Sequence, residues 1–351
     1  MTRFVEDRSP ALTTLTADRS WTLATVAGVV VAVVAGVVVA VVAGLIAGRD
    51  IGERSGVVGL AKDATILPVR VVGREDQDAD RVPRIAEGIR WAAGNGAKVM
   101  NLSLSTPFDP PAINAAIKYA LSKDVVIVAS AGNRATASET ADGARFPAAY
   151  PGVIGVAATD AKDVVTEDSI HGEHVSLAAP GYSVVTAFRD WGDCVYGTQG
   201  QSSSFATGYV SAAAALLRQR LPQESAAQIT HRLEVTASRA KRVARDDKAG
   251  WGLIQPYEPM TLAYDISVGG VHRPGLHRRA RRVLLAAHRL ARVGAGPRHR
   301  RPARGLGCGP AAAAARTGRD RDAGRLRDAR RPGLRAPAEP VVLIVHDRDE
   351  R

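Results

Sequence analysis

The chain has 351 residues, 46% of them hydrophobic, and a formal net charge of +12. The charge is uneven: residues 1–270 carry 26 Lys and Arg against 28 Asp and Glu, whereas residues 271–351 carry 21 Arg, no Lys and seven acidic residues. The basic character therefore belongs to the tail, which argues against a protein that binds nucleic acid along its whole length. Two cysteines, Cys194 and Cys308, are too few for a disulfide-dense scaffold or a four-thiolate zinc site.

An uncharged stretch, residues 22–48, follows the N-terminal segment. Within it the octapeptide Ala-Gly-Val-Val-Val-Ala-Val-Val occurs twice, at 27–34 and at 35–42. The stretch exceeds the roughly 20 residues that a membrane-spanning helix needs, so it is compatible with a transmembrane helix. Its high Val content favours instead a buried parallel strand that has been duplicated, because such strands also form unbroken apolar runs. Both interpretations stay open.

Residues 49–260 alternate between short apolar runs and amphipathic segments. The runs of strand length are 64–72, 97–104, 124–131 and 152–158. Segments with apolar residues three or four apart, which predict helices, are 84–93, 111–121, 205–217 and 226–235. This alternation predicts an α/β domain with a mainly parallel sheet that helices cover on both faces.

Two other segments are not predicted to fold around a core. The acidic run at 74–81 lacks the Gly and the final Glu of an EF-hand loop, so we expect a solvated loop, and no metal or cofactor site is predicted. The tail, 271–351, has no sustained apolar period, and we expect disorder with weak, nonspecific binding to anionic partners and no specific nucleic acid. Twenty-one Arg without Lys is also what a GC-rich gene encodes when it is read out of frame.

Three consecutive serines, ending with Ser204, stand where a glycine-flanked polar loop enters the Ala-rich helix predicted at 205–217. A hydroxyl at this place lies at the positive end of a helix, beside free backbone N–H groups, which suits a nucleophile. Serine is also an ordinary helix N-cap, so the pattern alone does not choose between the two roles.

The segment Ser-Ser-Ser-Phe-Ala-Thr-Gly-Tyr-Val-Ser-Ala-Ala-Ala-Ala-Leu-Leu, from Ser202, resembles the nucleophile helix of subtilisin-like serine proteases. It is most similar to that of the mycosins, proteases associated with type VII secretion in actinobacteria. Other segments resemble the same family in the same order: 59–71, 99–104, 128–133, 146–159, 175–181 and 250–256. The resemblance covers roughly 15–260. It implies a three-layer subtilisin-like α/β domain, hydrolysis of polypeptides through an acyl-enzyme without a cofactor, and a place at the cell membrane or outside the cytoplasm.

Carried over residue by residue, the resemblance makes Ser204 the nucleophile and the Asn133 amide a donor to the oxyanion. Ala35 stands where the family has the triad Asp, and Val38 stands where it has the triad His. We therefore expect a domain that is incomplete in its N-terminal part and a chain that is degenerate or inactive. Two alternatives are a pseudoprotease that binds peptide in the surviving cleft and a scaffold tethered to the membrane through 22–48.

The remaining histidines and the first cysteine offer no obvious replacement for the missing base. His171 and His174 are expected at the surface, and His231 is expected to face outward from its helix. Cys194 lies ten residues before Ser204 and is expected to be a free thiol.

Overall fold

The computed structural model describes most of the chain up to residue 262, namely residues 11–12, 15, 17–21, 23–24, 28–35, 39–49, 55–71, 81–137, 139–187, 192–198, 200–239 and 244–262. The tail predicted to be disordered and most of the acidic run lie outside the described residues.

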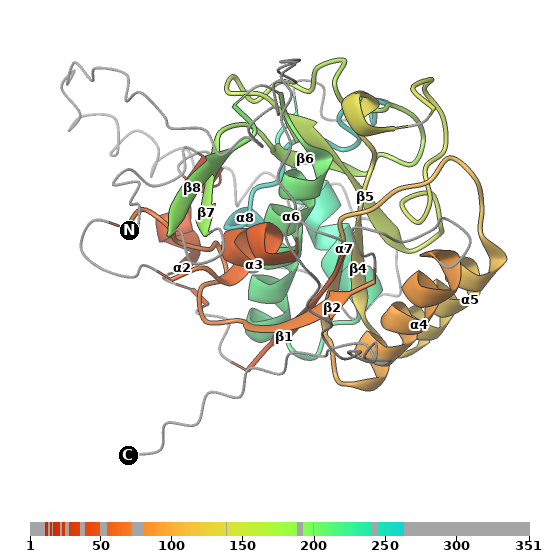
Figure 1. Cartoon of the computed structure of the whole chain (residues 1–351). Coiled ribbons are helices and arrows are strands. Elements are labelled where there is room, and N and C mark those ends of the chain that lie inside the picture. Colours follow the sequence, from red (N-terminus) through yellow and green to blue (C-terminus); the bar gives the residue numbers. More distant parts are fainter. Residues whose placement is uncertain are drawn as a thin grey trace, which may run out of the picture. The chain divides into compact units, whose positions relative to one another are not determined.

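The centre of the domain is a six-stranded parallel sheet with the order β2-β1-β3-β4-β5-β6 (Figure 1). Its strands are β1 (Val30–Ala35), β2 (Thr65–Arg70), β3 (Val99–Leu102), β4 (Val126–Ser130), β5 (Val153–Thr159) and β6 (Leu177–Pro180). A separate antiparallel pair consists of β7 (Val184–Ala187) and β8 (Asp193–Tyr196). The four strands predicted from the apolar runs are confirmed.

The described helices are α2 (Ala17–Trp21), α3 (Val39–Ala47), α4 (Arg81–Gly94), α5 (Pro111–Ser122), α6 (Ser203–Arg220), α7 (Ala226–Thr236), α8 (Glu258–Thr261) and the 3₁₀ turn η2 (Arg134–Thr136). All four helices predicted from the apolar spacing are present. Helices α4 and α5 lie side by side on one face of the sheet, and α3, α6 and α7 belong to the core on the other face.

Strand β1 shows how the three layers arise. Its side chains alternate between the two cores: Val31 and Val33 belong to the cluster that contains α3 and α6, and Ala32 and Val34 to the cluster that contains α4 and α5. All four are fully buried. An unbroken apolar run is what a strand covered on both faces requires. The predicted three-layer α/β fold with a mainly parallel sheet is therefore confirmed.

The repeated octapeptide takes two conformations. Its first copy supplies β1, whereas residues 39–42 of its second copy form the first turn of α3. The expectation of a duplicated strand is therefore correct only for the first copy. The alternative prediction of a transmembrane helix across 22–48 is wrong, because this stretch contains strand β1 and the separate nine-residue helix α3. Within the described residues, no helix has both the length and the apolar character needed to cross a membrane.

Candidate functional site

Ser204 lies in the first turn of α6, the long helix that runs through the core. The N-cap residue two positions earlier, Ser202, is extended (φ −133°, ψ 124°), and its side chain makes no capping hydrogen bond. The carbonyl of Ser204 accepts a hydrogen bond from the Ser103 hydroxyl at 3.1 Å. Ser204 is partly exposed, and its hydroxyl has no hydrogen-bond partner in the described part of the chain. Ser202 is partly exposed as well, so only Ser203 of the three serines is buried.

Ser203, by contrast, is fully buried and holds the side chain of Asn133. Its hydroxyl lies 2.6 Å from that of Ser130 and donates to Asn133 Oδ1 at 2.8 Å. Its backbone N–H donates to the same oxygen at 2.7 Å. Because the Ser203 proton is used on Asn133, the Ser130 hydroxyl must donate to Ser203, and it accepts from the Gly132 N–H at 3.2 Å.

This chain of hydrogen bonds fixes the orientation of the Asn133 amide. The oxygen Oδ1 is occupied by two donors from Ser203, so the amide nitrogen Nδ2 is directed away from them. Nδ2 has no hydrogen-bond partner among the described residues. The geometry therefore leaves an amide donor free beside the start of α6.

A buried polar chain supports the helix start from the sheet. Asn101, which is fully buried in β3, donates to the Ser103 hydroxyl at 2.8 Å and accepts from Ser211 at 3.1 Å. Ser103 in turn donates to the carbonyl of Ser204. Both polar atoms of the Asn101 amide are satisfied, as a buried amide requires. The position of Ser204 is thus tied to the middle of the sheet.

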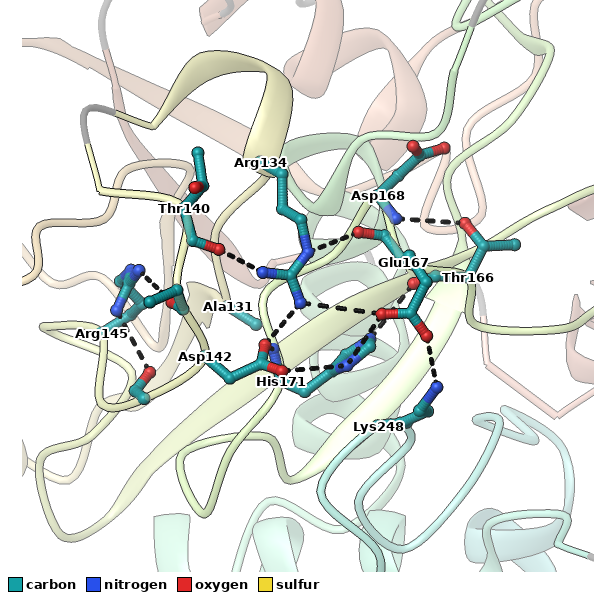
Figure 2. Close-up of polar contacts among 12 residues, drawn as sticks. Ala131, Arg134, Thr140, Asp142, Arg145, Thr166, Glu167, Asp168, His171 and Lys248 are labelled. Carbon is teal, nitrogen blue, oxygen red and sulfur yellow. Dashed lines mark hydrogen bonds and ion pairs between the residues drawn. The ribbon is translucent and has the colours of Figure 1, made fainter.

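The loop that follows Asn133 is held by ion pairs and backbone bonds, which Figure 2 shows around Arg134. The Arg134 guanidinium contacts Asp142 at 2.6 Å and the carbonyl of Glu167 at 2.6 Å, and it also contacts the carbonyl of Thr140. Its backbone N–H donates to the carbonyl of Asp168 at 2.9 Å. Burial alone would raise the pKa of Asp142, but hydrogen bonds from the His171 N–H and from Arg134 outweigh it and lower that pKa.

The positions expected to carry the triad Asp and His provide neither group. Ala35 ends β1 and is fully buried, and its methyl group can neither accept a proton nor orient an imidazole. Val38 lies outside the described residues. Only three residues separate β1 from α3. No histidine or carboxylate of the described residues is hydrogen-bonded to the Ser204 hydroxyl.

The other histidines are partly misjudged from the sequence. His171 and His174 are each only 5% exposed, so the expectation of surface histidines is wrong for both. The ring of His171 contacts the carbonyl of Thr166 at 3.2 Å, and the ring of His174 contacts that of Ala131 at 3.0 Å. Contacts between loops bury them, and apolar periodicity does not report such contacts. His231 is exposed on α7, as expected.

Cys194 also differs from the expectation. It is 1% exposed in β8 and is disulfide-bonded, so the prediction of a free thiol is wrong.

Comparison with known proteins agrees with this geometry. The profile of the subtilase family, Peptidase_S8, matches residues 40–252. The chain belongs to the subtilase family. Subtilisin BL from Lederbergia lenta is 34% identical over 183 residues, which are 52% of this chain and 64% of that protein. Subtilisin E from Bacillus subtilis is 32% identical over 185 residues, which are 52% of this chain and 46% of that protein. The subtilase thus matches less than two thirds of the length of these relatives.

Solved structures of mycosins resemble this subtilase over most of its length. MycP1 from Mycobacterium smegmatis is 26% identical with a TM-score of 0.67, and the similarity covers 78% of this chain and 89% of that one. MycP3 from the type VII (ESX-3) secretion system is 28% identical with a TM-score of 0.64, covering 74% and 89%. The resemblance drawn from the nucleophile helix and the ordered strand segments is confirmed.

Proposed function

We propose that this subtilase has lost catalytic competence and binds extended polypeptide in the cleft beside Ser204. In this proposal Ser204 occupies the nucleophile position and Asn133 is the donor to a peptide carbonyl. The main support for this proposal is that the nucleophile and oxyanion-donor positions keep suitable residues, whereas the position of the triad Asp does not. The Asn133 amide is held by Ser203 and has a free Nδ2 donor, whereas β1 ends in Ala35, where the family has a carboxylate.

The chemistry explains why the preserved half is insufficient for catalysis. A serine hydroxyl is a poor nucleophile at neutral pH until an adjacent base takes its proton. In subtilisin, the loss of either the serine or the histidine lowers kcat by a factor of about 2 × 10⁶. The donor to the oxyanion and the binding groove contribute independently of the base, so peptide can still bind. Binding without turnover is the result.

In this proposal the peptide lies along two segments that are neighbours in the structure. A Cβ atom on Gly132 would lie 3.3 Å from the Ser105 hydroxyl, which places the segment after β3 beside the end of β4. Similarity to mycosins from type VII secretion systems supports a polypeptide partner and a site of action at the membrane or outside the cytoplasm.

Labelling with a fluorophosphonate probe tests the loss of catalysis. We expect the folded full-length chain to label no faster than its Ser204→Ala variant, with an active subtilisin as the positive control. Labelling of the parent chain that disappears in Ser204→Ala would mean that some other group activates the hydroxyl, and the proposed inactivity would be wrong.

Peptide binding is tested separately, by fluorescence anisotropy with fluorescein-labelled casein peptides. Ser204→Ala should bind as the parent does, because its hydroxyl is not required for binding. Asn133→Ala should bind about 2- to 10-fold more weakly, the effect of one lost hydrogen bond. Asn114→Ala, a substitution on α5, is the matched control. Equal affinities for all four proteins would exclude the Asn133 amide as a peptide contact.

A further inference from the structure

We propose that a second site in this subtilase, an open cavity bordered by His174, binds a small organic cation: an ammonium or amidinium group carried on an apolar body. The cavity has a volume of about 920 Å³ and lies between the segment 142–153, the segment 171–176 and α7. It includes neither Ser204 nor Asn133. The inference is therefore independent of the proposed peptide binding.

The first argument is an unused acceptor on a buried histidine. His174 is 5% exposed, and its Nε2 lies 3.0 Å from the carbonyl oxygen of Ala131. A carbonyl only accepts, so Nε2 carries the proton and Nδ1 presents a lone pair. Burial lowers the pKa of His174, which favours this neutral form. Nδ1 is buried and has no hydrogen-bond partner among the residues that the structure describes.

On one side of this nitrogen the backbone carries no side chain. Gly172, which also lines the cavity, has φ +150°, and a Cβ atom at this position would lie 3.0 Å from His174 Nδ1. Any side chain at position 172 would therefore crowd the unused acceptor. A hydrogen-bond donor supplied from the cavity would satisfy Nδ1, and buried acceptors without a donor are rare in folded proteins.

The second argument is the sign of the charge. Four carboxylates line the cavity, and no Lys or Arg is among its lining residues. Asp142 and Asp247 are paired with arginines outside the lining, at 2.6 Å and 2.8 Å. Glu173 and Glu234 form no ion pair within the described residues. Burial raises the pKa of Glu234, and the charge of Arg245 offsets this effect only in part. The lining therefore favours a positively charged ligand.

The third argument separates an organic cation from a metal ion. Among the described residues, no three His, Cys, Asp or Glu side chains are grouped closely enough to hold a metal. The cavity instead offers aromatic rings, Phe146 and Tyr150, whose centroids are 4.9 Å apart. The Tyr150 hydroxyl is occupied, since it donates to Asp109 at 2.5 Å. Apolar ring surface beside carboxylates suits an ammonium group on an aromatic or aliphatic body.

Two probes of the same shape test this proposal on the full-length chain. Benzylamine is a cation at pH 7 to 8, and benzyl alcohol is its neutral counterpart. We expect benzylamine to bind saturably by calorimetry, to shift the Nδ1 signal of His174 in ¹⁵N NMR spectra, and to bind about 10-fold more tightly than benzyl alcohol. Added salt should weaken the binding of the amine only.

Variants locate the site. Gly172→Ala crowds Nδ1, and His174→Phe removes the acceptor while keeping a ring, so each should weaken benzylamine binding about 10-fold. His231→Phe, on the exposed face of α7, should leave it unchanged. If Gly172→Ala fails to fold because of its φ, His174→Phe alone decides the location. Equal affinity for the alcohol, unchanged binding in His174→Phe, or no saturable binding of benzylamine in the millimolar range would overturn the proposal.

Discussion

The hydroxyl pair of Ser130 and Ser203 allows the preserved half of the site to be tested as a unit. Ser203→Ala removes the acceptor of the Ser130 proton, and Ser130 is only 2% exposed, so a buried donor is left unsatisfied. The Asn133 amide loses one of its two donors but keeps the Ser203 N–H at 2.7 Å. An unsatisfied buried polar group lowers the free energy of unfolding by about 1–3 kcal/mol, and we expect a loss of that size.

Ser130→Ala should have a smaller effect of about 1–2 kcal/mol, because Ser203 can still donate to Asn133. The double variant lacks both hydroxyl groups, so neither hydroxyl remains buried without the other as its partner. The loss should then be smaller than the sum of the single losses by about 1 kcal/mol.

The assay is urea unfolding of the parent chain, both single variants and the double variant, compared at a common m-value. Ser225 provides the control, because its side chain caps α7 at a separate place and Ser225→Ala should add to Ser130→Ala without coupling. Additive losses within about 0.5 kcal/mol for Ser130 and Ser203 would refute the hydrogen-bond order given above.

Three further outcomes are expected. Gly44→Ala would place a Cβ atom in steric overlap with the Thr186 hydroxyl and should lower the free energy of unfolding by about 1–3 kcal/mol. Gly94→Ala, whose Cβ atom would have only one neighbour, at 3.9 Å, should be neutral or stabilising in the same urea-unfolding experiment. Glu224→Gln should lower the free energy of unfolding in urea by about 3–5 kcal/mol, because it removes the anion that is paired with the buried Arg232. The double variant Glu224→Leu with Arg232→Met should lose less stability than this single variant. Burial lowers the pKa of His174 from its usual 6.5, so the contribution of His174 to stability is complete above pH 6.5 and is lost as the pH falls toward the lowered pKa. The free energy of unfolding of His174→Gln should therefore depend less on pH in that range than that of the parent chain. An equal slope for the two proteins would contradict this.

The regular part of the fold could be predicted because each element is locally consistent. Helices α4 and α5 have apolar residues at helical spacing, and β4 and β5 are short apolar runs between polar turns. The alternation of such segments requires a parallel sheet between helices. Ser204 and Asn133 could be selected only through the resemblance to subtilisin-like proteases, because three consecutive serines also suit a helix N-cap.

Contacts between distant segments could not be predicted from these patterns. The partners of Ser203 lie about 70 residues earlier in the chain, and nothing in a run of three serines distinguishes the buried one from the accessible one. His171 and His174 were misplaced because the segments that cover them are loops without a period.

The repeat at the N-terminus has a consequence for the register of the sheet. Residues 26–36 and 34–44 are identical, so a slip of eight residues would rebuild β1 with the same side chains. Helix α3 would not survive it, because its buried residues Val41, Val42, Leu45 and Ile46 would be replaced by Arg49, Asp50, Glu53 and Arg54. Burial of four such side chains is worth roughly 6–12 kcal/mol, which is comparable to the whole stability of a domain. Strand β1 is therefore held in register by the helix that follows it, and substitutions in α3 that reduce its burial should allow β1 to adopt a second alignment with the same side chains.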